Sequence, residues 1–305
     1  MKSPDPGSRL YQAPWVSVGH YTHPEYATGC TAIVFSRLSR ASALVGGGAP
    51  GTCETDLLRP GALVQAVDAI ILSGGSAFGL DCATGARQYL AERGRGFDAA
   101  GYRVPIVPSA VIFDLPSING DFRPGRNEGY LACKASENPD PAEGRVGAGT
   151  GATVGKYLGR EKASPGGLAS RYAVLDDGVG IGALAVVNSF GDVYDPQAGK
   201  VVAGPGCGQG SSTGHLDASW ERPAFGNTTL AVVVTDAGLD TDSLAHVARM
   251  AHDGLARTTY PAHTPYDGDV VFVVSTGEKK AQAARLGAFA AWMVEKSVVA
   301  AVTSA

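Results

Sequence analysis

Short runs of apolar, often β-branched residues alternate with glycine-rich breaks along most of the chain. Runs of this length bounded by turn-forming residues are typical of β-strands. The run at 182–188 is apolar at nearly every position, which is typical of a strand buried on both faces. The pattern predicts strands at 31–35, 69–72, 106–107, 110–113, 182–188, 228–235 and 270–274, and the signal at 228–235 is the strongest.

Three longer segments repeat apolar residues at the spacing of an amphipathic helix. They predict helices at 76–93, 241–258 and 279–299. Strands followed by helices, with several strands apolar on both faces, indicate an α/β protein built from stacked sheets that helices cover.

Three other segments lack this periodicity. Residues 1–12 are polar and proline-rich, and we expect a loose tail there. The charged segment 121–145 is interpreted as a surface excursion, and the Gly/Ser/Pro-rich segment 196–226 as an exposed, mobile loop. None of them is typical of a linker between domains, so residues 1–305 are interpreted as a single domain.

Composition narrows the class of protein. Hydrophobic residues make up 44% and charged residues 18% of the chain, as in ordinary globular proteins. The net charge of −4 provides no general attraction to nucleic acid, which is not expected as a partner. The first residues lack an apolar signal region and no run of 18 apolar residues follows, so we expect a cytoplasmic protein without a membrane partner.

Familiar catalytic and binding motifs are missing or incomplete. The five cysteines contain no C-x-x-C pair, which favours free thiols, and no metal or cofactor is expected. The segment 74–78 misses the last glycine of a G-x-S-x-G elbow, and 46–51 holds a proline inside its apparent dinucleotide motif. His246 and His252 lie six residues apart, which does not suit a shared metal, so exposed or capping roles are expected. Lys156 follows a glycine-rich apolar segment and would need a partner if it were buried.

Two further segments carry candidate chemistry. Asp267 and Asp269 alternate just before a predicted strand, so both can project to the same side; a turn or capping role explains them equally well. Asn227 and Thr228 stand where a predicted loop meets the strongest strand. A hydroxyl there can attack the carbonyl before it, and the freed α-amine of Thr228, with an ordinary pKa of about 7.7 to 8.0, can act as the base for its own hydroxyl.

With these residues in view, the chain resembles the L-aminopeptidase/D-esterase family, which includes β-aminopeptidases and nylon-oligomer hydrolases. The resemblance extends from about Gly29 to the C-terminus. Several segments carry it, in the family's order: 72–80 (LSGGSAFGL), 146–152 (VGAGTGA), 187–193 (VNSFGDV), 227–229 (NTT), 250–257 (MAHDGLAR) and 267–269 (DGD).

The resemblance implies a four-layer α-β-β-α fold like that of N-terminal nucleophile hydrolases, with different connectivity. It also implies self-cleavage into chains 1–227 and 228–305. In the threonine subgroup the nucleophile matches Thr228, a lysine matches Lys156, the oxyanion-side asparagine matches Asn188 and the paired acids match Asp267 and Asp269. The two aspartates are expected to orient the new ammonium and the lysine.

The chain also departs from family patterns. Aminopeptidase members have serine as nucleophile and Ser-x-Glu in place of residues 267–269, and Phe113 replaces a tyrosine of the nylon-oligomer hydrolases. Phe113 and Gly149 are expected to lie in the substrate pocket.

The leading functional interpretation is an autoprocessed amidohydrolase of small peptides or linear amide oligomers. The alternatives are an aminopeptidase or esterase acting on free-amine substrates, and a non-catalytic binding member of the fold. By resemblance alone, a homo-oligomer of four or more chains is expected.

Overall fold

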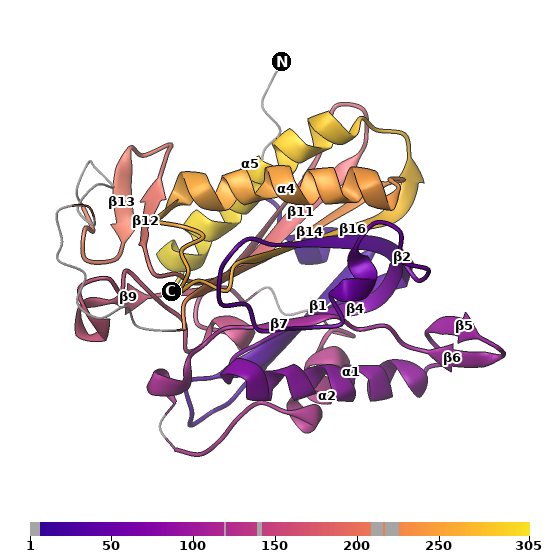
Figure 1. Ribbon diagram of the computed structural model, residues 1–305, viewed down its shortest axis with the longest axis horizontal. Coiled ribbons are helices and arrows are strands. Elements are labelled where there is room, and N and C mark those ends of the chain that lie inside the picture. Colours follow the sequence, from indigo (N-terminus) through magenta and orange to yellow (C-terminus); the bar gives the residue numbers. More distant parts are fainter. Residues whose placement is uncertain (1–6, 119, 139–141, 209–215, 217–225) are drawn as a thin grey trace.

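The computed structural model describes residues 7–118, 120–138, 142–208, 216 and 226–305. Helices form the two outer layers (Figure 1): α4 (Thr241–Thr258) and α5 (Ala283–Thr303) cover one side, and α1 (Cys82–Ala91) and α2 (Arg126–Ala135) cover the other. Between them lies one large mixed sheet, whose two halves form the two inner layers. Its path is β10 (Gly167–Val174), β11 (Gly180–Asn188), β14 (Thr228–Ala237), β16 (Val270–Lys279), β2 (Gly29–Val45), β4 (Ala66–Ser73), β7 (Ser109–Val111) and β3 (Thr52–Cys53), and β1 (Val16–Thr22) also pairs with β2.

The long strand β2 joins the two halves of this sheet. Its first part pairs with β1 and β4, and its last part pairs with β16. The register with β4 shifts between Val34 and Ser39, and the residues between Phe35 and Ser39 are exposed. A bulged strand bends and twists more strongly than a regular one, so β2 can contribute to both layers.

Alternate side chains of the central strands face different cores. Ala231 and Val233 of β14 pack in the apolar core beneath α4 and α5. Leu230 and Val232 pack on the other face, in a second core shared with Ile33 and other residues of β2 and β4. A third core lies between the outer face of β2 and β4 and helices α1 and α2. Three cores between four layers confirm the predicted α-β-β-α arrangement.

Smaller elements surround this frame. They are the hairpin β5 (Phe97–Ala99)–β6 (Tyr102–Val104), the pair β8 (Thr153–Val154)–β9 (Ser164–Pro165), the small sheet of β12 (Asp192–Asp195), β13 (Lys200–Ala203) and β15 (Thr259–Tyr260), and the 3-10 turns η1 (Leu10–Gln12), η2 (Asp56–Leu58), η3 (Ser76–Asp81), η4 (Leu115–Ser117), η5 (Gly147–Gly149) and η6 (Arg160–Lys162).

Most predicted elements are present. The helix predicted at 241–258 has the observed bounds of α4, and the helix predicted at 76–93 is split into η3 and α1. The strand predicted at 106–107 is absent, because Pro105 and Pro108 flank it and proline lacks the N–H that a strand ladder requires. Helix α5 is long and apolar enough to cross a membrane by length and composition, but 67% of its most apolar window is buried inside the protein.

The segments predicted to be irregular contain some regular structure. The loose tail is wrong at Leu10, which is fully buried in η1 and whose N–H donates to Ser170 Oγ at 3.2 Å. The surface excursion at 121–145 contains α2, whose buried face consists of the small residues Gly129, Ala132 and Cys133. Within the predicted mobile loop at 196–226, residues 200–203 form β13; residues 209–215 and 217–225 lie outside the described residues.

Candidate active site

Three strand ends bring the candidate residues together. Asn188 is the last residue of β11 and pairs in register with Thr228, the first residue of β14. A parallel bridge joins Asn227 to Asp267, just before β16. Side chains of directly paired residues project from the same face of a sheet, so the sheet register places Asn188 beside Thr228.

The peptide bond between Asn227 and Thr228 is held in a defined environment. Thr228 Oγ1 donates a hydrogen bond to the carbonyl oxygen of Asn227 at 2.5 Å, and the backbone N–H of Gly268 donates to the same oxygen at 2.7 Å. Asn227 and Thr228 are both buried. The hydroxyl therefore lies next to the carbonyl that it would attack, and the carbonyl oxygen already has a backbone donor.

Gly268 is itself constrained by this arrangement. A Cβ at this position would come within 2.8 Å of Thr228 Oγ1 and 2.7 Å of the Ala49 carbonyl oxygen. Such distances are too short for carbon, so glycine is required for close approach to the hydroxyl. The donor function of Gly268 belongs to its backbone, and sequence reasoning missed it because side-chain type gives no sign of a backbone hydrogen bond.

Asn188 and Lys156 form a second part of the site. Lys156 Nζ donates to the carbonyl oxygen of Asn188 at 2.8 Å and to its Oδ1 at 3.0 Å. The backbone N–H of Thr153 also donates to Oδ1, at 3.0 Å. Two donors on one side of the amide identify that atom as oxygen, so Nδ2 points the other way, towards the carbonyl oxygens of Gly226 at 3.3 Å and Phe113 at 3.4 Å.

The two aspartates are held by backbone and hydroxyl donors. Asp267 Oδ2 accepts from the N–H and the hydroxyl of Thr264, at 2.9 and 2.5 Å, and its Oδ1 accepts from Phe190 N–H at 3.4 Å. Asp269 Oδ1 accepts from the N–H of Thr229 at 2.6 Å, next to the candidate nucleophile. The aspartates were expected to orient Lys156, but the hydrogen bonds from its amine go to Asn188.

Burial shifts the ionisation of these groups. The pKa of Lys156 lies well below its ordinary value, first because the amine is buried and second because Arg160 is near; Asp267 and Asp269 oppose this shift. Burial, and then the charge of Asp269, raise the pKa of Asp267 to about 6. Shifts of this kind are typical of catalytic groups, although structural ion pairs also produce them.

Two histidines continue the site away from Thr228. His263 Nδ1 lies 2.8 Å from Asp269 Oδ2, and its Nε2 lies 3.3 Å from Nδ1 of His252. His252 Nε2 lies 3.0 Å from the carbonyl oxygen of Leu44. His252 is buried on α4, so its expected exposed or capping role is wrong. The sequence signal was the proximity of His263 to residues 267–269, which spacing rules for metal ligands did not detect.

Of the two expected pocket residues, Phe113 lies at the site. Its carbonyl oxygen faces Asn188, and its ring lies against Gly226, where an added Cβ would overlap the ring and φ is +99°. The guanidinium of Arg160 lies 5.5 Å from the centre of the ring. Gly149 lies in η5, where an added Cβ would come within 2.6 Å of the backbone nitrogen of Leu168.

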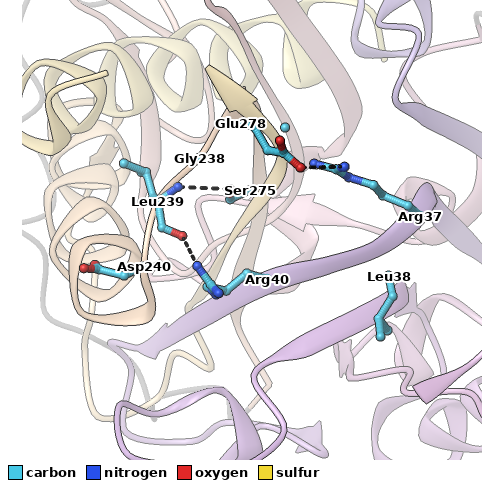
Figure 2. A pocket seen from close by; sticks show the side chains of 9 residues that line it. Arg37, Leu38, Arg40, Gly238, Leu239, Asp240, Ser275 and Glu278 are labelled. Atoms are coloured by element: carbon cyan, nitrogen blue, oxygen red, sulfur yellow. Dashed lines mark hydrogen bonds and ion pairs between the residues drawn. The ribbon is translucent and has the colours of Figure 1, made fainter. Parts of the chain in front are cut away.

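A surface pocket of about 510 Å³ lies near the opposite ends of β14 and β16 (Figure 2), roughly 30 Å along the strand from Thr228. Its charged groups already have partners: Arg37 bonds to Glu278, and Arg40 donates to the carbonyl oxygen of Leu239. Because of its distance from Thr228, this pocket is separate from the candidate active site. In the described part of the chain, no cluster of three or more His, Cys, Asp or Glu side chains could hold a metal ion.

The chain is similar to known proteins over most of its length. Residues 12–305 match Peptidase family S58. An uncharacterized aminopeptidase of Mycobacterium tuberculosis is 40% identical over 283 residues, covering 86% of this chain and 79% of the relative. A 6-aminohexanoate-oligomer endohydrolase of Kocuria sp. is 30% identical over 284 residues, covering 88% and 75%.

Two solved structures share the fold. A β-aminopeptidase of Burkholderia sp. has a TM-score of 0.72 at 19% identity, covering all of this chain and 89% of the other. The L-aminopeptidase D-Ala-esterase/amidase of Ochrobactrum anthropi, described as a new variant among the Ntn hydrolase fold, has the same TM-score at 18% identity, covering all of this chain and 88% of the other. These similarities confirm the fold class predicted from the sequence. With its matched residues, relatives and fold, the chain belongs to Peptidase family S58 and is a hydrolase of peptide or amide bonds.

Proposed function

We propose that this protein cuts its own chain between Asn227 and Thr228 and then uses Thr228 as the nucleophile of an amidohydrolase. The observation that carries the proposal is the pair of hydrogen bonds on the Asn227 carbonyl oxygen, from Thr228 Oγ1 at 2.5 Å and from Gly268 N–H at 2.7 Å. The nucleophile and a hydrogen-bond donor for the oxyanion lie at one peptide group, which is the arrangement that acyl transfer requires.

Self-cleavage would proceed as an acyl shift. Thr228 Oγ1 bonds to the Asn227 carbonyl carbon, and the negative charge that develops on the oxygen is stabilised by Gly268 N–H. The C–N bond then breaks, the nitrogen receives the hydroxyl proton, and an ester joins Asn227 to Thr228. Water hydrolyses this ester and leaves a free amine on Thr228. One oxyanion donor is typically worth about 2.7 to 4 kcal/mol in such a step.

Cleavage also prepares the site for substrate. In the uncut chain, Asn188 Nδ2 faces the carbonyl oxygen of Gly226, which belongs to the departing side of the cut. Once that segment moves away, the same N–H is free to donate to the oxyanion of a substrate, while Thr153 and Lys156 still fix the amide. The α-amine of Thr228 would accept the hydroxyl proton during turnover.

Intact-mass spectrometry tests the proposal. Wild-type protein is expected as two fragments, 1–227 and 228–305, and Thr228→Ala as one uncut, inactive chain. Thr228→Ser keeps a hydroxyl and is expected to be cut. The matched control is Thr229→Val, because Thr229 Oγ1 is buried and has no hydrogen-bond partner among the described residues; it should be cut normally. A normal cut in Thr228→Ala would show that another group is the nucleophile.

The proposed substrates are small peptides or linear amide oligomers. The name of the Kocuria relative favours oligomers, whereas that of the Mycobacterium tuberculosis relative favours an aminopeptidase. Hydrolysis rates for an amino-acid amide and its N-acetylated counterpart separate these two candidates. Comparable rates would exclude recognition of a free amine, and a strong preference for the free amine would favour the aminopeptidase. An uncut chain without amidase activity would instead indicate a binding member of the fold.

A further inference from the structure

A chain of four groups connects the nucleophile's strand to the far side of the site. It runs from Asp269 through His263 and His252 to the carbonyl oxygen of Leu44, with distances of 2.8, 3.3 and 3.0 Å. Asp269 is 2% exposed and His252 6% exposed. At its inner end, Asp269 Oδ1 accepts the N–H of Thr229, the residue after the nucleophile.

The partners determine where the protons lie. A carbonyl oxygen only accepts, so His252 Nε2 must carry the proton that it donates to Leu44. Burial disfavours a positive charge on His252, and a neutral His252 has a bare Nδ1, which accepts from His263 Nε2. His263 Nδ1 faces a carboxylate oxygen, which also accepts when it is ionised. Both nitrogens of His263 therefore carry protons, and its ring is an imidazolium.

We propose that His263 is a positioning residue, held as an imidazolium by His252 and Asp269, and that it compensates the negative charge of Asp269 beside Thr228. Its effect on catalysis rests on the proposed function above, whereas its protonation state does not. The raised pKa of His263, caused first by its hydrogen bond to Asp269 and opposed by burial, agrees with this assignment. The lowered pKa of His252, caused first by burial, agrees with its neutral state.

The backbone around His263 and Gly46 supports this arrangement of the two rings. His263 has a φ of +56°, in the left-handed region that is costly for residues other than glycine and asparagine. Its own N–H also donates to Asp269 Oδ2, at 3.1 Å. At the end of β2, an added Cβ on Gly46 would come within 2.7 Å of His252 Cε1 and 3.3 Å of His263 Nδ1. The two rings are thus confined by a glycine that leaves room for both.

The charges around the two rings favour a proton on His263. Asp269 and Asp267 both raise the pKa of His263, from the loop that precedes β16. His252 faces His263 from α4. The charges of Asp269 and of its own neighbour Asp253 partly offset the lowering of the pKa of His252. Of these carboxylates, Asp269 contacts the histidine pair directly.

This charge has a consequence for the freed amine of Thr228. An uncompensated carboxylate stabilises an ammonium and raises its pKa, and a charged amine cannot accept the hydroxyl proton. With His263 protonated, Asp269 belongs to a neutral pair and this effect is weakened. The imidazolium therefore helps to keep the amine available as a base near neutral pH.

Protonation can be measured directly on the wild-type protein. With ¹⁵N-labelled histidine, long-range ¹H–¹⁵N NMR distinguishes an imidazolium, with two protonated nitrogens, from either neutral tautomer. The His263 signals are assigned by their loss in His263→Asn; asparagine suits the left-handed backbone and keeps an N–H donor without the charge. We expect an imidazolium at pH 7. A neutral His263 ring at pH 7 would overturn the proposal, whether or not the chain is cut.

The pH profile of kcat/KM tests the catalytic consequence. In His263→Asn the acidic limb should move to higher pH by about one unit, with a loss of about tenfold at pH 7. The two profiles should converge at alkaline pH, where His263 of the wild type also loses its proton. His246→Asn, at an exposed position on α4, the helix that also carries His252, should retain the wild-type profile. Coincident profiles for His263→Asn and wild type would overturn the inference, whereas an uncut and inactive wild type would refute the proposed function instead.

Discussion

Lys156 is 2% exposed, and both hydrogen bonds from its amine go to Asn188. The sequence indicated that a buried lysine here would need a partner, but the partner is an asparagine from the end of β11 and not an aspartate. Neutral acceptors satisfy the amine without stabilising its charge as an ion pair would, which fits the direction of its pKa shift. A lysine of this kind releases its proton more readily than an ordinary lysine.

The lowered pKa has a thermodynamic sign that can be measured. The unfolded chain binds a proton at this lysine below its ordinary pKa of 10.5, and the folded chain binds it only at lower pH, so the lysine destabilises the fold increasingly as pH falls from 10.5 towards the folded pKa. Lys156→Met removes this effect. We expect the Tm of the variant minus that of the wild type to become more positive from pH 10 to pH 6.

Calorimetry or a fluorescence melt at several pH values measures this difference. Exposed Lys134 on α2 provides the control, Lys134→Met, for which the difference should be flat over the same range. A flat difference for Lys156→Met as well would mean that Lys156 stays charged in the folded protein. The variant should also lose amidase activity, because the orientation of Asn188 depends on its bond to the amine.

The contact between helices α1 and α2 shows why a helix can lack the periodic pattern of large apolar residues. Their contact is made by small residues: an added Cβ on Gly85 would overlap the carbonyl oxygen of Arg126, and one on Gly129 would overlap that of Cys82. Small residues on facing helices allow the backbones to approach closely, with little apolar side-chain area. The periodicity of large apolar residues, on which helix prediction depends, is therefore weak in α2.

Gly129→Ala separates helix propensity from this close contact. Alanine favours an isolated helix by about 1 kcal/mol over glycine, but here the methyl group would displace α1, and overpacking typically costs about 1 to 3 kcal/mol. We expect a net decrease in Tm of a few degrees, measured by circular dichroism. Asn127→Ala, at an exposed position on the same helix, should not lower the Tm. A higher Tm for Gly129→Ala would show that the helices separate easily.

At the scale of the whole molecule, the sheet order determines what happens after a cut. Strands β14 and β16 belong to the 228–305 segment, and they lie between β11 and β2 of the 1–227 segment. Helices α4 and α5 belong to the same C-terminal segment and cover one face of the sheet. Separating the segments would break two full strand interfaces and expose two of the three cores.

The two fragments should therefore remain associated after cleavage. They are expected to elute together in size-exclusion chromatography under native conditions and to separate only with denaturant. The comparison is an uncut Thr228→Ala chain, which should elute at the same volume. Native mass spectrometry of the same samples would also test the expected homo-oligomer of four or more chains. Elution of the 1–227 fragment by itself would contradict the prediction.

Most of the central strands, the helices with large apolar faces and the candidate residues Thr228, Asn188, Lys156, Asp267 and Asp269 could be predicted without coordinates, because periodicity, side-chain chemistry and family motifs are local properties. How these residues meet depends on the folded arrangement of the strands and helices. The Gly268 N–H on the scissile carbonyl, the asparagine beside the lysine and the His263–His252 chain all depend on strand register and on the approach of α4 to the end of β2. Such contacts join residues far apart in sequence or use backbone groups, which every residue type has, so no pattern of side chains specifies them.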